Sequence, residues 1–147
     1  MALVRSFYVD AAPAGVWSIL TDVERWPEWT GTITRMYVER GASLGLGALV
    51  HAESPGGRKT EWTVTEFDAP RSLTWEMRPS AGVVVSSGHV IMPEGDGSRV
   101  TFAVNTRGWA GRLLAPLVHR QLRPNLESEV TGFKRRAEER ARGEPQG

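Results

Sequence analysis

The chain has 147 residues, 40% of them hydrophobic, which suits a single domain that forms its core without covalent cross-links. It contains no cysteine, so disulfides, thiolate metal sites and cysteine nucleophiles are excluded. The formal net charge of +1 gives no indication of a nucleic-acid partner. The N-terminus lacks a signal-peptide pattern and no apolar run approaches the ~20 residues of a membrane span, so we expect a soluble, cytoplasmic protein.

The first thirty or so residues predict one strand followed by two short helices. Residues 4–9 are expected to form a short strand. Asp10 is a candidate helix cap, and Pro13 suits the first turn of the helix that follows. Asp22 ends this helix and is a candidate cap for a second short helix over residues 23–29.

Alternating residues then predict six further strands joined by short turns. The clearest alternation lies in residues 72–78, where Leu73, Trp75 and Met77 share one face. Strands that follow one another through short connections indicate an antiparallel meander. The six expected strands cover residues 33–40, 48–53, 59–67, 72–78, 82–92 and 99–106.

From Trp109 onward the apolar period is that of a helix. Pro116 is expected to separate a short first turn from the main helix, and Pro124 to break or kink it. The charged tail from residue 138 is expected to fray, with residues 143–147 disordered. The apolar stripe consists of Leu114, Leu117, Val118, Leu122, Leu126, Val130, Phe133 and Ala137. The charged residues between them are interpreted as a solvated helix face: Arg120, Arg123, Glu127, Glu129, Lys134, Arg135, Arg136, Glu138 and Glu139.

These elements predict an α+β domain over residues 1–142, in which a seven-stranded curved antiparallel sheet surrounds the long C-terminal helix. The two short helices lie between the first two strands and can close one end. Curvature leaves space between sheet and helix. A dry void of roughly 500 Å³ would cost about 12 kcal/mol, which rivals the whole stability of a domain. The space is therefore expected to hold water, a ligand or tryptophan side chains.

Five segments resemble the START/Bet v1-like (SRPBCC) superfamily of helix-grip proteins, and within it the polyketide cyclase/dehydrase-like group. They are residues 9–13 (VDAAP), 16–20 (VWSIL), 22–29 (DVERWPEW), 70–75 (PRSLTW) and 97–102 (GSRVTF). The resemblance extends over nearly the whole chain and implies the helix-grip fold. It leaves the activity open, because the superfamily includes lipid and hormone carriers as well as cyclases.

Large side chains expected to face the interior are the candidate ligand contacts, and the chain has six tryptophans. Trp26 is interpreted mainly as the side chain that anchors the second short helix in the core. Trp17 is interpreted as a core residue, and for Trp29 a core position and a ligand contact are weighed equally. The candidate ligand-binding residues are Trp26, Trp29, Met36, Trp62, Trp75, Met77, Val85, Ser87, His89, Phe102 and Leu122.

The three histidines show no metal-binding spacing, so no metal and no cofactor are predicted. His51 shares a strand face with Glu53, which favours a solvated polar face over an oriented general base. If the strand over residues 82–92 turns His89 inward, Ser87 and His89 are polar points in an apolar pocket. His119 is expected at the surface or the cavity rim. The weak catalytic candidates are His51, His89, Ser87 and Arg35.

Three functions remain open at this stage. The first is binding of a hydrophobic, aromatic or polyketide-like small molecule by a monomer or homodimer. The second is an enzyme of the polyketide aromatase/cyclase type that uses the same cavity to steer a ring closure. The third is a protein-interaction or stress-response module, which an exposed apolar groove without a closed pocket would favour.

Overall fold

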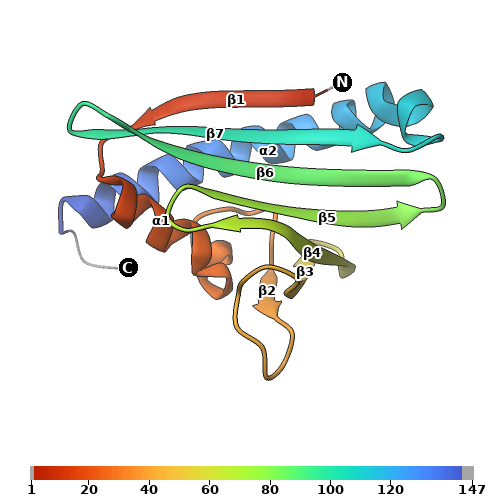
Figure 1. Cartoon of the computed structure of the whole chain (residues 1–147), viewed down its shortest axis with the longest axis horizontal. Helices are drawn as coiled ribbons and strands as arrows, with labels where there is room; N and C mark the ends of the chain where they lie inside the picture. Colours follow the sequence, from red (N-terminus) through yellow and green to blue (C-terminus); the bar gives the residue numbers. More distant parts are fainter. Residues whose placement is uncertain (1, 144–147) are drawn as a thin grey trace.

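A computed structural model describes residues 2–143 and has the predicted order of elements (Figure 1). In chain order these are β1 (Ala2–Val9), α1 (Pro13–Thr21), η1 (Val23–Glu28), β2 (Arg35–Val38), β3 (Leu49–Ser54), β4 (Arg58–Asp68), β5 (Ser72–Ser80), β6 (Val83–Glu94), β7 (Gly97–Arg107) and α2 (Gly111–Ala141). The helix-grip prediction is confirmed. Residues 144–147 of the predicted disordered tail lie outside the described residues, whereas residues 138–141, expected to fray, are helical.

The seven strands form one antiparallel sheet in the order β1-β7-β6-β5-β4-β3-β2. β1 returns beside the last strand, so the first two strands of the chain form the opposite edges of the sheet. The long helix α2, drawn in blue, crosses one face of the sheet and packs on β1, β6 and β7 (Figure 1). α1 packs on α2 and β6, which closes one end of the space between sheet and helix.

Alternation along the strands places the core on the face covered by α2. Leu73 and Trp75 of β5 are buried, and Trp75 pairs in register with Ser87 of β6. The same parity turns Val85 and His89 of β6 inward, which decides the orientation that the sequence left open. The core therefore lies between one sheet face and one helix, as a two-layer domain requires.

Both prolines lie inside a single continuous helix, so the predicted separation at Pro116 is wrong, and of the two effects predicted for Pro124 the break does not occur. Each proline removes one backbone N–H donor. Pro116 and Pro124 are both exposed, so water can solvate the carbonyl that each leaves unbonded. Packing of Ala115 and Leu126 on the core holds the helix continuous across both positions.

The predicted caps are also wrong. Within residues 2–143, no side-chain hydrogen bond caps α1 or η1, although Pro13 does begin α1. The backbone N–H of Asp10 instead donates to the Glu138 carboxylate at 2.9 Å, which ties the β1–α1 connection to α2. The Asp22 carboxylate pairs with Arg25 at 3.1 Å.

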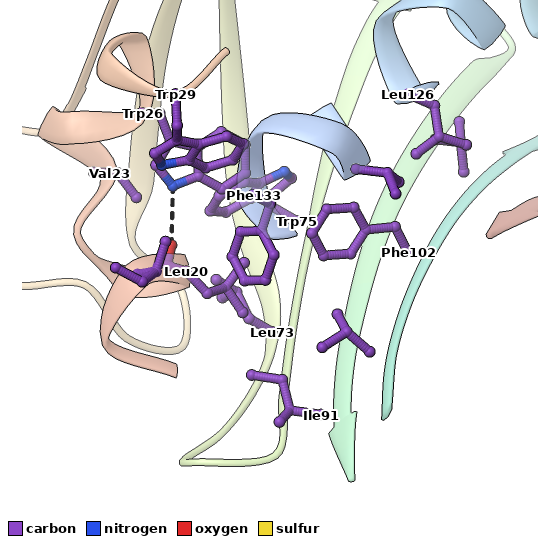
Figure 2. Close-up of a cluster of buried hydrophobic side chains, with 14 of the residues drawn as sticks. Leu20, Val23, Trp26, Trp29, Leu73, Trp75, Ile91, Phe102, Leu126 and Phe133 are labelled. Atoms are coloured by element: carbon purple, nitrogen blue, oxygen red, sulfur yellow. Dashed lines mark hydrogen bonds between the residues drawn. The ribbon is translucent and has the colours of Figure 1, made fainter. Parts of the chain in front are cut away.

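A very close approach of α2 to the rest of the fold occurs at Gly132. A Cβ atom at this position would lie 1.7 Å from the Trp29 carbonyl oxygen, which is a backbone atom. Figure 2 shows the neighbouring Phe133 among Trp29, Trp75 and Phe102. The Phe133 ring centroid lies 5.4 Å from that of Trp29 and 5.1 Å from that of Phe102. The missing side chain at Gly132 thus lets α2 approach the end of η1.

We expect Gly132→Ala to lower the free energy of unfolding by more than about 2 kcal/mol, because a backbone oxygen cannot move aside as a side chain can. Gly15→Ala is the matched control, since no atom lies within 4 Å of its Cβ position and Gly15 is exposed in α1. The control should gain about 0.5–1 kcal/mol from helix propensity. Urea denaturation of the two variants measures both values, and equal stabilities would contradict the close approach.

Candidate functional site

Two hollows of different chemistry lie on the two faces of the sheet. A cavity of about 350 Å³ lies between the sheet and α2. A trough of about 900 Å³ lies mainly on the outer face of β3, β4 and β5, and charged side chains such as Glu53, Lys59, Glu61 and Arg78 line it. The trough is larger, but the inner cavity is the more apolar of the two and has the character of a small-molecule site.

Aromatic and sulphur-containing side chains form the wall of the inner cavity. Trp62 and Trp75 face it from β4 and β5, and Trp26 faces it from η1. The Trp26 indole N–H donates to the Leu20 carbonyl at 3.0 Å, which holds this ring in place (Figure 2). The predicted ligand-binding residues that line the cavity are Trp26, Met36, Trp62, Trp75, Met77, Val85, Ser87 and Leu122.

The other predicted ligand contacts, Trp29, His89 and Phe102, do not line this cavity. They are buried behind it and pack on its wall. The His89 ring centroid lies 5.2 Å from that of Trp75 and 4.9 Å from that of Phe102. The Trp29 ring centroid lies 4.8 Å from that of Trp26. These three residues therefore support the cavity wall by packing. The sequence alone had suggested that they contact the ligand, or had left the choice between core and ligand contact open.

His89 is a neutral group that orients Ser87. Its Nδ1–H donates to the Leu73 carbonyl at 2.9 Å, which leaves Nε2 as an acceptor 3.5 Å from the Ser87 hydroxyl. Burial lowers the pKa of His89 to about 4, and the bond to Leu73 opposes this only in part. At neutral pH His89 therefore lacks the second proton that an acid catalyst would donate. Ser87 is the residue of this pair that faces the cavity.

Glu129 of α2 is the residue that sequence reasoning missed. It was expected on the solvated face of the helix, but it lies in the cavity wall and accepts a hydrogen bond from the Thr32 hydroxyl at 3.3 Å. Burial raises the pKa of Glu129 to about 7, and the bond from Thr32 offsets only part of this. Both the acid and the carboxylate are therefore populated near neutral pH. A signal was present, because Glu129 follows the cavity residue Leu122 by seven positions and so shares its helix face.

His51 and Arg35 lie on the outer face of the sheet and cannot touch a molecule in the inner cavity. The His51 ring stacks on Tyr37 at 4.9 Å and contacts the Glu39 carboxylate. Arg35 lies over the same Tyr37 ring at 4.5 Å and pairs with Glu53 at 3.5 Å. This arrangement is the solvated cross-strand polar face that the sequence favoured.

Two further side chains of α2 differ from expectation. His119 is buried, not at the surface or rim, and its Nε2 lies 3.2 Å from the Thr106 hydroxyl. Burial lowers the pKa of His119, and Arg123 acts in the same direction. Arg136 is also buried and donates two hydrogen bonds to Glu28 at 3.0 Å, so it joins α2 to η1 and is not part of a solvated face.

Within residues 2–143, no group of three or more histidine, cysteine, aspartate or glutamate side chains is placed to hold a metal ion. In the same range, no helix combines the length and apolar character needed to cross a membrane.

We expect Glu129→Gln to raise the free energy of unfolding at about pH 8 by about 1–2 kcal/mol. The variant and the parent should have the same free energy of unfolding near about pH 4. The folded protein keeps the proton up to about pH 7, whereas the unfolded chain releases it near the ordinary value of 4.5. The folded state thus binds more protons in this window, and its stability falls as the pH rises through it. Because the Glu129 side chain faces the cavity and is only partly buried, the difference is smaller than full burial would give.

Urea denaturation of both proteins across this pH range measures the effect. Glu127→Gln is the matched control, because Glu127 forms a surface ion pair with Arg5 and should change stability little at either pH. A Glu129→Gln variant with the same stability as the parent at both ends of the range would show that Glu129 is solvated.

Residues 2–138 match the family described as polyketide cyclase / dehydrase and lipid transport. A search of the curated proteins found no match.

Solved structures share the fold at low sequence identity. TTHA0849 from Thermus thermophilus is 22% identical with a TM-score of 0.70, covering 93% of this chain and 97% of its own. A START superfamily protein from Mycobacterium smegmatis is 15% identical with a TM-score of 0.75, covering 94% and 97%. The di-domain ARO/CYC StfQ from the steffimycin biosynthetic pathway is 14% identical with a TM-score of 0.72, and the match covers 97% of this chain but 50% of that one. The family match and the observed fold agree with the resemblance in the sequence, and the chain belongs to the polyketide cyclase/dehydrase and lipid transport family.

Proposed function

We propose that this protein binds a hydrophobic, aromatic or polyketide-like small molecule in the cavity between the sheet and α2. The observation that carries the proposal is the cavity itself, about 350 Å³ in volume and walled by Trp26, Trp62 and Trp75. Its volume is at the lower end of the range of roughly 300–1,000 Å³ that small-molecule sites occupy.

An energetic argument supports occupation of this space. At about 24 cal/mol per Å³, a dry void of this size would cost about 8 kcal/mol, which is comparable to the whole stability of a domain. The cavity must therefore hold water or a ligand. Water needs polar partners, and much of the wall is apolar, including three indole rings and the thioethers of Met36 and Met77. Flat aromatic molecules suit these faces, because rings stack on tryptophan and thioethers adapt to ring edges.

The polar groups of the cavity would orient such a ligand. Glu129 and Thr32 meet on one side, and Ser87 faces the cavity from β6. A hydroxyl or carbonyl on an otherwise apolar ligand can pair with these groups, whereas a purely hydrocarbon ligand would leave them without a partner. The preferred ligand is therefore apolar over most of its surface and carries oxygen at one end.

We expect Leu122→Trp to weaken ligand binding by about tenfold or more, because the larger ring occupies the cavity from the helix side. Ser128→Trp is the control, since Ser128 is exposed on the same helix and does not line the cavity. Tryptophan quenching and native mass spectrometry with naphthoquinones, flavonoids, sterols and fatty acids supply the dissociation constants. If no compound in the panel binds the parent protein, the proposal fails.

A second candidate function, ring closure of a poly-β-ketone, is favoured by one observation. Glu129 lies in the cavity with a pKa of about 7, which suits a group that both accepts and donates a proton. The carboxylate would remove a proton from the carbon between two ketones, and that carbon would attack a third carbonyl. The resulting alkoxide would take the proton back from the Glu129 acid. His51 and Arg35 have no part in this step, because they lie on the other sheet face.

For this second function we expect Glu129→Gln to reduce ring closure of a synthetic poly-β-ketone by about 10²-fold or more. Binding of a non-reactive naphthoquinone should change by less than about threefold, because the amide keeps the volume of the carboxyl. Product analysis by chromatography gives the rate, and quenching gives the affinity. An unchanged rate in the variant would exclude Glu129 as the acid–base group and leave binding as the function.

A further inference from the structure

The start of α2 carries an exposed apolar patch, which we define as Trp109, Leu113, Leu114 and Leu117. Trp109 is 76% exposed, Leu113 81%, Leu117 62% and Leu114 41%. Large apolar side chains grouped in this way are unusual on the surface of a folded protein and mark an interaction site. Apart from Leu114, which also lines the cavity, the side chains of this patch belong neither to the core nor to the cavity wall.

The patch is built on the fold and does not belong to a frayed end. The Trp109 indole packs over Gly82, where a Cβ atom would lie 2.4 Å from the ring, so the turn before α2 is anchored to the β5–β6 turn. The backbone N–H groups of Ala110 and Gly111 both donate to the Gly82 carbonyl, at 3.0 and 3.1 Å. Leu113 and Leu117 are one helical turn apart and point the same way.

The charged side chains of the segment that carries the patch are all of one sign. No aspartate or glutamate occurs between residues 108 and 126, whereas Arg112, Arg120 and Arg123 are exposed there. Over the described part of the chain, none of these three guanidinium groups lies within ion-pair distance of a carboxylate. The first acidic residue after the patch, Glu127, is paired with Arg5.

The apolar patch together with its arginines favours one of the possible binding partners. In a symmetric pair of this chain the patch would face itself, and the same arginines would meet each other without a counter-charge. A surface of anionic lipids supplies both partners at once: headgroups for the arginines and acyl chains for the leucines. Tryptophan is itself enriched at the membrane–water boundary.

The patch is continuous with the mouth of the cavity. Leu114 belongs to the patch and also lines the cavity, and Val118 and Leu122 extend the lining inward from it. Pro79 and Ser80, across from the helix, line the same opening and are exposed. We propose that the Trp109–Leu117 patch and its arginines dock the protein on an anionic membrane surface, with the cavity mouth directed toward the lipids.

Vesicle sedimentation tests this proposal directly. The parent protein should sediment with phosphatidylcholine vesicles that contain about 30 mol% phosphatidylglycerol, and should be released at about 0.5 M NaCl, where surface charge is screened. It should not sediment with phosphatidylcholine alone. The double variant Leu113→Glu/Leu117→Glu should lose about tenfold or more in vesicle affinity. The charge variant Arg112→Gln/Arg120→Gln should lose about 2 kcal/mol of binding, or about thirtyfold.

Leu46→Glu is the matched control, because Leu46 is 73% exposed but lies outside the patch, and this variant should sediment as the parent does. Size-exclusion chromatography with light scattering tests the competing occupant of the patch, a second copy of this chain. A parent dimer that the leucine variant dissociates, without any vesicle binding, would overturn the proposal in favour of a second copy. Absence of both dimer and vesicle binding would overturn it as well. Ligand binding in solution is measured separately, so docking can fail while the proposed ligand binding stands.

Discussion

The C-terminal half of α2 packs against a layer of aromatic side chains, formed by Trp29, Phe102 and Phe7. The rest of the structure depends on this contact. Phe133 fits among Trp29, Phe102 and Phe7, and the bare backbone at Gly132 lets the helix touch the end of η1. The two halves of the helix differ in what they bury. The C-terminal half buries large side chains such as Phe133, whereas the N-terminal half buries Gly111, Ala115 and His119. The helix therefore grips the sheet firmly at one end and leaves a cavity near the other.

The same asymmetry explains the chemistry of the site. Glu129 lies at the transition between the two halves, so its carboxyl faces the cavity and its pKa rises to about 7. The aromatic layer behind the wall, with neutral His89 at its centre, holds Trp75 and Ser87 in place without supplying a charge. A binding site with aromatic side chains in its wall and a carboxyl group that titrates near neutral pH can serve a carrier or a ring-closing enzyme. Family membership does not choose between these roles, because activity belongs to particular side chains and not to the fold.

The exposed patch at the start of α2 follows from the same arrangement. Where the helix leaves the core, its apolar residues have no sheet to cover them, and Leu113 and Leu117 face solvent. An ordinary surface helix would carry charged pairs there, yet this segment has arginines without acids. Cavity mouth and patch share Leu114, so the route of a ligand and the proposed docking surface coincide. In the outer trough, by contrast, His51 contacts the carboxylates of Glu39 and Glu61 and stacks on Tyr37.

The sequence by itself determined the order of elements and the antiparallel sheet, because period-2 and period-3.6 patterns depend on neighbours a few positions away. Leu73, Trp75 and Met77 could be assigned to one face in this way. Only the tertiary structure decided which side chains reach the cavity and which support it from behind. His89 and Phe102 share the strand parity of cavity residues, and Trp29 lies beside Trp26 at the end of η1, yet all three are buried behind the cavity wall. Glu129 was expected to be solvated. A helical pattern shows on which face of α2 a residue lies, but it does not show whether the sheet leaves a cavity opposite that face. That depends on how far the helix stands from the sheet, which long-range packing sets.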